Sequence, residues 1–148
     1  MSEKHIDYDY LSLTQELHSL TKMIHQSLDD QIKDFNISRL HAPYIKLLSV
    51  FKTGLTQKEL TSKLGVDKAN TSRAINDLVK KNYVKKDFQE NLEINYKLVL
   101  TEKGLALSNT LMKTVEDKYV ELFSVLELEE LETFRRIVKK ITSSAIIK

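Results

Sequence analysis

The residues best suited to specific chemistry lie within one short segment, KANTSRAINDLVK, which begins at Lys68. An asparagine amide can pair with adenine through two hydrogen bonds, and an arginine guanidinium can pair with guanine in the same way. Asn70 and Arg73 are three positions apart, so a helix would place both side chains on one face. This spacing indicates a face that can hydrogen-bond to the edges of base pairs.

The rest of the segment predicts a helix with two different faces. At 100° per residue, four residues cluster on one side of this helix and are predicted to face a core. These are Thr71, Ile75, Leu78 and Val79. The opposite face is polar, with short hydrogen-bonding groups near its first turns. It carries Ala69, Asn70, Arg73, Asn76, Asp77 and Lys80, flanked by Lys68 and Ser72.

A shorter helix precedes this segment and is joined to it by a tight turn. Thr56 and Glu59 have the spacing of a capping box, which predicts a helix start. Gly65 ends that helix by adopting a left-handed backbone conformation. Asp67 is a good N-cap for the next helix, predicted over about residues 68–81. Two short helices with a glycine turn are typical of a helix-turn-helix, whose second helix enters the DNA major groove.

Thr56 and Gln57, at the start of the shorter helix, would suit contacts with DNA phosphates. The alternative for the two helices is a plain helical hairpin with a polar outer face. The chain after Tyr83 makes that alternative less favoured. YVKK and INYKLVL alternate and are rich in β-branched and aromatic residues, which predicts a β-hairpin connected by DFQENLEIN. Two helices followed by two strands is the order of a winged helix.

Composition limits the fold and its environment. The chain has 148 residues, 41% apolar and 30% charged, with 3 glycines and 1 proline, which predicts one mostly helical domain. The absence of cysteine excludes disulfides, cysteine zinc ligands and thiol redox sensing. There is no N-terminal signal core, and no apolar run approaches roughly 18 residues. We therefore expect a cytoplasmic protein with no membrane association.

Charge is unevenly distributed, although the net charge is only +2. Residues 56–86 include eight basic and three acidic residues, a local charge of +5. In residues 115–132, seven acidic residues accompany only Lys118. A basic middle beside an acidic region is typical of a protein that binds a polyanion. A solvated helical surface with uneven charge is the alternative.

Long helices are predicted on both sides of the winged helix, which uses about residues 44–104. Residues 12–33 carry one apolar stripe, and Ser12 with Gln15 fits a capping box at its start. Two more helices follow the winged helix. The predicted inward residues are Leu13, Leu17, Leu20, Ile24 and Leu28 in the first helix, Leu105, Leu111, Val115, Tyr119, Leu122 and Leu126 in the next, and Leu131, Phe134, Val138, Ile141 and Ala145 in the last.

These three stripes predict a homodimer, because no second domain is present to bury them. The spacing of three and four residues in the last helix is typical of a helix–helix seam. Folding of the helices back on one another is the alternative, but we favour association of two chains. A two-fold dimer would set two recognition helices about one DNA turn, roughly 34 Å, apart.

The runs LTQKELTSKLGV, INDLVKKNYV and LVLTEKG, with the Ser72-Arg73 pair between the first two, resemble the MarR family of bacterial transcription regulators. The resemblance covers essentially the whole chain. It implies a single, mainly α domain. A winged helix-turn-helix lobe with a small β-hairpin wing spans about residues 44–104, and helices from about residues 8–35 and 105–148 form a dimerisation region. It also implies an obligate homodimer that represses or activates at a pseudo-palindromic operator on double-stranded DNA, often relieved by a small ligand or oxidant.

By position in that family, residues 68–73 form the leading part of the recognition helix. Lys85, Lys86 and Lys97 belong to the wing. The family's wing commonly carries Asp-x-Arg near its tip, where this chain has Leu92-Glu93-Ile94. A loop with Asp87, Glu90 and no arginine would be repelled by phosphates, so its insertion into the minor groove is unfavourable. The predicted DNA contacts are Thr56, Gln57, Lys68, Asn70, Thr71, Ser72, Arg73, Asn76, Lys85, Lys86 and Lys97.

Two hydroxyl residues also depart from the usual helix-turn-helix pattern. Thr61 and Thr71 stand where that pattern more often has Ala and Val. Both side chains can pack inside a core, so the departure is mild.

No catalytic site, cofactor or metal site is predicted, and we do not expect an enzyme. The three glycines are too far apart for a phosphate-binding loop, and no nucleophile–base pattern is present. The four histidines are scattered. His18 and His25 lie seven residues apart on one helix face, which leaves a zinc-responsive sensor as a distant alternative.

In the MarR family, effectors bind where the dimerisation helices meet the DNA-binding lobe. Tyr8, Tyr10, His41, Tyr44 and Phe51 would line such a place and suit a small aromatic or amphipathic effector. At helical spacing, such residues are more often part of the core or its rim. The leading hypothesis is thus a dimeric DNA-binding regulator, with repression favoured. Its rival is a winged helix used as a protein-interaction module, motivated by the acidic wing without arginine.

Overall fold

The computed structural model of the chain describes residues 7–88 and 96–144. Its order of helices and strands confirms the predicted fold class, mainly α with a β-hairpin wing. The elements are α1 (Tyr10–Ile32), the 3-10 turn η2 (Lys33–Phe35), α2 (Ala42–Val50), α3 (Gln57–Leu64), α4 (Lys68–Lys80), β1 (Val84–Asp87), β2 (Lys97–Leu100), α5 (Glu102–Phe123) and α6 (Leu128–Thr142).

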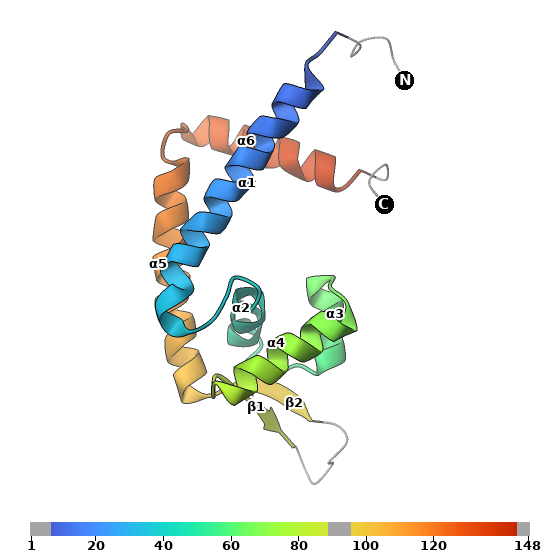
Figure 1. The fold of residues 1–148 in the computed structure, drawn as a ribbon, viewed down its shortest axis with the longest axis vertical. Coiled ribbons are helices and arrows are strands. Elements are labelled where there is room, and N and C mark those ends of the chain that lie inside the picture. The colour runs from blue at the N-terminus through green and yellow to red at the C-terminus, as the bar shows by residue number, and fades with distance from the viewer. Residues whose placement is uncertain (1–6, 89–95, 145–148) are drawn as a thin grey trace.

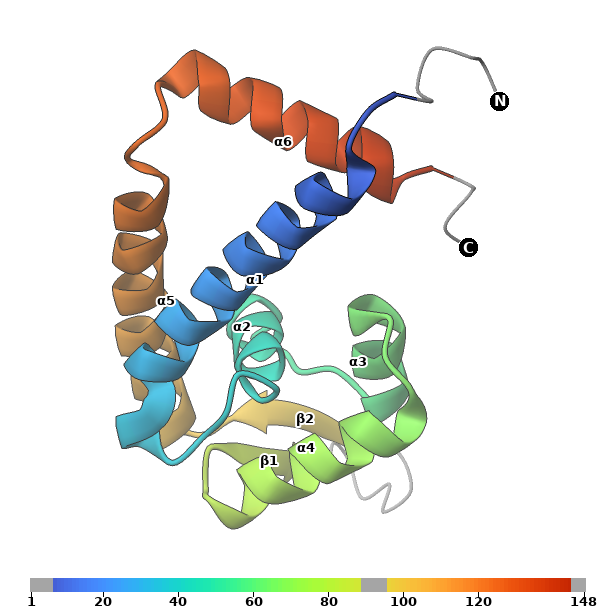
Figure 2. The same ribbon diagram turned by 45° about the horizontal axis from the view of Figure 1, so that its top comes forward.

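The molecule has a lobe at one end and three long helices that extend from it. Helices α2, α3 and α4 gather with the β1–β2 hairpin at the base of both views (Figures 1 and 2). Helix α5 leaves the hairpin and runs away from the lobe, with α1 packed across its lower half. Helix α6 turns back at the far end of α5, so that α1, α5 and α6 outline an open triangle (Figure 2).

The lobe closes a hydrophobic core within a single chain. Leu60 of α3, Leu78 of α4 and Leu98 of β2 are completely buried, at 0% exposed area. The strands pair antiparallel with Val84 opposite Leu100, and Leu55 adds a bridge to Leu98 just before α3. Each element of the lobe therefore covers the apolar face of another.

The start of α5 is pressed against the turn that precedes β1. Thr101 caps the helix: its Oγ1 accepts the Gly104 N–H at 3.0 Å and its hydroxyl donates to the Asn82 carbonyl at 2.6 Å. A Cβ atom on Gly104 would lie 2.0 Å from the Tyr83 carbonyl oxygen. Only glycine therefore lets α5 approach the lobe this closely, which fixes the long helix to the wing.

Two details predicted for the long helices are wrong. Ser12 and Gln15 do not cap α1, because the helix begins one turn earlier: the Asp9 carboxylate accepts the Ser12 N–H at 3.0 Å and the Ser12 hydroxyl at 2.6 Å. Leu105, predicted to face inward, is 42% exposed. Leu107 takes the inward position instead and is 4% exposed, because the face of α5 that meets the lobe is set by Gly104.

The outer helices leave their apolar stripes largely uncovered. Helix α6 contains no buried residue, and α1 contains only Ile32, at the end next to the lobe. Leu17 is 42% exposed and Ile141 is 52% exposed; Ala145 lies outside the described residues. Within residues 7–88 and 96–144, no helix combines the length and apolar character needed to cross a membrane.

Candidate nucleic-acid interface

A reciprocal capping box fixes the start of α3, as predicted. Thr56 Oγ1 accepts the Glu59 N–H at 3.1 Å, and the Glu59 carboxylate accepts the Thr56 N–H at 2.8 Å. The second hydrogen bond lowers the pKa of Glu59. The Thr56 hydroxyl acts as an acceptor here, which leaves its own proton for an external acceptor such as a phosphate. Gln57, the first residue of α3, is half-buried beside it.

The turn between α3 and α4 is set by Gly65 and Asp67, again as predicted. Gly65 has a φ of +63°, in the left-handed region, and the Val66 N–H reaches back to the Thr61 carbonyl at 3.3 Å. Asp67 caps α4, since its carboxylate accepts the Asn70 N–H at 2.7 Å. These contacts build the helix-turn-helix and fix the direction in which α4 leaves the turn.

Helix α4 presents most of its predicted base-reading residues to solvent. The exposed ones are Lys68, Asn70, Arg73 and Asn76, and Ser72 is half-buried. Asn70 and Arg73 also contact each other, because the Arg73 guanidinium donates to Asn70 Oδ1. Asn70 Nδ2 donates in turn to Asp67 Oδ2 at 3.1 Å. The capping carboxylate thus organises the outer face, and Asn70 must exchange these partners in order to pair with a base.

Thr71 was predicted to contact DNA, and the structure corrects this. Its side chain has 0% exposed area. Thr71 Oγ1 lies 2.9 Å from Thr61 Oγ1 and 3.3 Å from the Tyr44 hydroxyl. The physical reason is helical periodicity: Thr71 shares the inward face of α4 with Ile75 and Leu78. The prediction assigned nearly every residue from Lys68 to Arg73 to DNA, including Thr71, although the periodicity of the helix already placed Thr71 inward.

The wing carries its basic residues on two paired strands. Lys85 and Lys86 of β1 are exposed, and Lys97 of β2 is half-buried opposite Asp87. The Lys86 ammonium lies 4.8 Å from the centre of the Tyr96 ring, a cation–π contact. The predictions for the wing tip, Glu90 and residues 92–94, lie outside the described residues.

The structure brings together two of the candidate effector residues. His41 and Tyr44 line a cavity of about 480 Å³ between α2 and α4, which also borders Asn70 and Arg73. Tyr10 and Phe51 do not line this cavity. Tyr10 begins α1 and packs edge-on against the Tyr8 ring, and Phe51 lies under the Lys63 ammonium at 4.6 Å.

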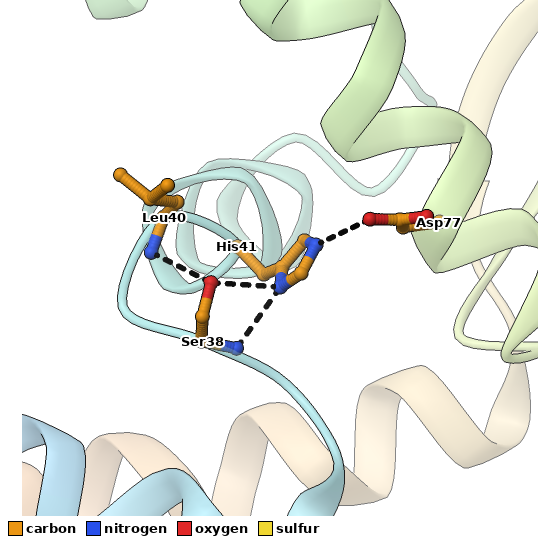
Figure 3. A network of polar contacts seen from close by, with 4 residues as sticks. All are labelled: Ser38, Leu40, His41 and Asp77. Carbon is orange, nitrogen blue, oxygen red and sulfur yellow. Dashed lines mark hydrogen bonds and ion pairs between the residues drawn. The ribbon is translucent and has the colours of Figure 1, made fainter.

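His41 connects the start of α2 to α4 (Figure 3). Its Nδ1 accepts the Ser38 N–H at 3.0 Å, which leaves the ring proton on Nε2, 3.4 Å from Asp77 Oδ2. Burial lowers the pKa of His41 and outweighs the opposite effect of Asp77. The ring is therefore a neutral hydrogen-bonding bridge at neutral pH, not a charged partner.

These contacts between α2 and α4 were missed from the sequence. Tyr44 and Thr71 are 27 positions apart, and His41 and Asp77 are 36 positions apart, so no local periodicity links them. The one available signal was the pair of hydroxyl residues, Thr61 and Thr71, at positions that are more often apolar. Among the described side chains, no group of three or more His, Asp or Glu is placed to hold a metal ion.

Comparison with known proteins agrees with this geometry. The model of the MarR family matches residues 35–91. The HTH-type transcriptional regulator TcaR of Staphylococcus aureus is 28% identical over 141 residues, which cover 93% of this chain and 91% of TcaR. Among solved structures, MepR of S. aureus in complex with DNA superposes with a TM-score of 0.79 at 18% identity, covering 92% of this chain and 98% of MepR.

A MarR family regulator from Listeria monocytogenes, solved with a 26mer DNA, has a TM-score of 0.73 at 21% identity, covering 87% of this chain and 85% of that one. At these identities, the solved structures establish the shared fold. The family model and the relative TcaR add similarity in sequence, over residues 35–91 and over 93% of the chain respectively. The chain is therefore similar to the MarR family of transcriptional regulators in the sequence of residues 35–91 and in its fold.

Proposed function

We propose that this protein is a sequence-specific DNA-binding transcriptional regulator, acting in the cytoplasm as a repressor at a pseudo-palindromic operator. The observation that carries the proposal is the outer face of α4, where Asn70 and Arg73 are exposed on the second helix of a helix-turn-helix. Two relatives of the same fold, MepR and the Listeria protein, were solved with DNA. We extend that activity to this chain.

Each part of the lobe has a distinct role in this proposal. Helix α4 enters the major groove, where Arg73 reads guanine and Asn70 reads adenine. The start of α3, with Thr56 and Gln57, contacts phosphates and sets the orientation of the lobe. The wing lysines lie along the backbone and contribute charge without reading sequence.

We further propose that the protein binds DNA as a homodimer. The apolar stripes of α1 and α6 support this, because both are largely uncovered within the described part of one chain. Two-fold symmetry would duplicate α4 at about one DNA turn, roughly 34 Å, and so demand a pseudo-palindromic site. A small aromatic or amphipathic effector that entered the cavity beside His41 and Tyr44 would act next to Arg73.

The experiment that tests the proposal replaces Arg73. Duplexes are first selected from a random pool with the wild-type protein, and binding of the enriched duplex is then measured for Arg73→Ala. We expect a loss of about 1–3 kcal/mol with the oligomeric state unchanged. Arg135→Ala, in α6 and far from the lobe, is the matched control and should bind like the wild type. Unchanged affinity of Arg73→Ala would refute the assigned role of α4.

Salt dependence separates this proposal from the use of the winged helix as a protein-interaction module. Asp87 on the wing favours that alternative, because a carboxylate near DNA phosphates is repelled. Contacts with phosphates predict that log K falls linearly and steeply with the logarithm of salt concentration. A flat response would favour the interaction module.

A further inference from the structure

Three hydroxyl groups meet where α2, α3 and α4 pack together. Thr71 of α4 is completely buried, Tyr44 of α2 is 4% exposed, and Thr61 of α3 is half-buried. The Tyr44 and Thr71 oxygens are 3.3 Å apart, and the Thr71 and Thr61 oxygens are 2.9 Å apart. Thr61 Oγ1 also lies 2.8 Å from the carbonyl oxygen of Gln57. The contacts therefore form one chain of hydrogen bonds, called the hydroxyl chain below, which begins in α2 and ends on the backbone of α3.

Counting protons gives this chain a direction. The Gln57 carbonyl can only accept, so it takes the single hydroxyl proton of Thr61. Thr71 can then donate to Thr61 Oγ1 at 2.9 Å, which is closer than its other acceptor, the Asp67 carbonyl oxygen at 3.5 Å, and Tyr44 donates to Thr71. In this arrangement each of the three hydroxyls donates once, and none is left without an acceptor, which would be unfavourable at a buried site.

The hydroxyl chain joins two parts of the proposed DNA-binding face. Thr71 lies between Asn70 and Ser72 in α4, so its inward anchor sets the height and rotation of the outward amide and guanidinium groups. The other end of the chain is Gln57, the first residue of α3, beside the proposed phosphate contacts. Building on the proposed function, we infer that Thr71 is a positioning residue, which fixes the base-reading side chains of α4 relative to the phosphate-contacting start of α3.

A hydroxyl chain does this differently from the apolar residues that more often occupy these positions. Apolar contacts are non-directional, so two helices packed through Ala and Val can shift by small amounts at little cost. Hydrogen bonds weaken steeply outside a narrow range of distance and angle. Base reading needs such geometry, whereas contact between lysines and phosphates does not. Loss of the chain should therefore reduce sequence discrimination more than general DNA affinity.

The test compares two DNA probes: the duplex that the wild-type protein enriches from a random pool and an unrelated duplex of equal length. Thr71→Val removes the hydroxyl and keeps the shape of the side chain. We expect affinity for the enriched duplex to fall at least about fivefold, and affinity for the unrelated duplex to stay within about twofold. Thr71→Ser keeps the hydroxyl and should restore discrimination.

Two further variants connect the effect to the chain. Tyr44→Phe removes the first donor and should reduce discrimination in the same direction, and it should add little to Thr71→Val, because both break the same chain. Thr114→Val is the matched control, since the Thr114 hydroxyl donates only to the Thr110 carbonyl of its own helix, at 2.7 Å. It should bind both duplexes like the wild type.

The inference is overturned if Thr71→Val keeps full discrimination, or if it weakens both duplexes equally. Should Thr71→Val not fold, Tyr44→Phe decides by the same two measurements. The proposed function fails differently: a wild-type protein that enriches no duplex refutes the proposed function and this inference together. An enriched duplex that Thr71→Val discriminates normally refutes this inference alone.

Discussion

Helices α4 and α6 have similar amphipathic sequences but opposite surroundings. Helix α4 buries Thr71, Ala74, Ile75 and Leu78 in the lobe, whereas α6 buries nothing within one chain. In both helices the apolar residues recur at the spacing of a single helical face. The difference teaches that such a stripe shows which face must be covered. It does not show whether the cover comes from the same chain or from another.

The largest expected effect is on the stability of the lobe, where the apolar face of α4 is covered by the same chain. Leu78→Ala leaves a cavity in a completely buried site, so the free energy of unfolding should fall by about 2–5 kcal/mol. Urea denaturation at fixed protein concentration measures it. Lys80→Ala, on the exposed face of the same helix, should cost less than about 0.5 kcal/mol. A similar loss for both variants would contradict a closed core in the lobe.

The uncovered helix should respond through association instead. Val138→Glu places a charge in the apolar stripe of α6, and we expect the dimer dissociation constant to rise at least about tenfold, which corresponds to about 1.4 kcal/mol. Lys140→Glu introduces the same side chain on the other side of α6 and is the matched control. Sedimentation equilibrium measures both. A wild-type chain that is monomeric, or a Val138→Glu dimer as tight as the wild type, would mean that these helices do not form the dimer seam.

A smaller effect is expected where local sequence alone sets the structure. Thr56→Ala removes half of the capping box of α3, and we expect it to lower the free energy of unfolding by about 1 kcal/mol. Thr53→Ala, at an exposed position outside any cap, should be neutral. Chemical denaturation of both variants provides the measurement. Equal stabilities of the two would show that the cap contributes nothing.

The sequence predictions succeeded for interactions between residues close in the sequence and failed for interactions between residues far apart in it. The start of α3 and the turn between α3 and α4 were predictable because Thr56, Gly65 and Asp67 act on neighbours within three or four residues. The contacts of Tyr44 with Thr71 and of His41 with Asp77 were not, since they depend on how α2 crosses α4. Even local signals compete: Asp9 and Ser12 are both good N-caps, and only the point at which the chain enters α1 selects Asp9.

The same limit applies to the candidate site. The outward position of Asn70 and Arg73 followed from helical periodicity and is present in the structure. Thr71 had two conflicting assignments, inward by periodicity and DNA-facing by family position, and periodicity was right because a buried position on α4 is fixed by its neighbours Ile75 and Leu78. The pattern of residue types could not reveal that its hydroxyl would find partners on two other helices.

The smallest expected effect concerns the junction between the two regions, where the segment after α1 contacts both. Arg39 pairs with Asp29 of α1 at 3.1 Å, and His41 contacts Asp77 of α4. Burial lowers the pKa of His41, helped by the nearby charge of Lys81 and opposed by Asp77. Protonation would also place an N–H on Nδ1 against the Ser38 N–H. The neutral ring is thus the form that the folded state favours.

This gives the pH dependence a definite sign. An unfolded histidine takes up its proton near the ordinary pKa of 6.5, while folded His41 takes it up only at lower pH. Between the two values the unfolded chain binds more protons, so stability falls as the pH drops below 6.5 and levels off below the pKa of folded His41. In urea unfolding from about pH 8 to about pH 5, His41→Gln should lose this part of the slope. Parallel curves for the two proteins would mean that folding leaves the pKa of His41 unchanged, which would contradict this prediction.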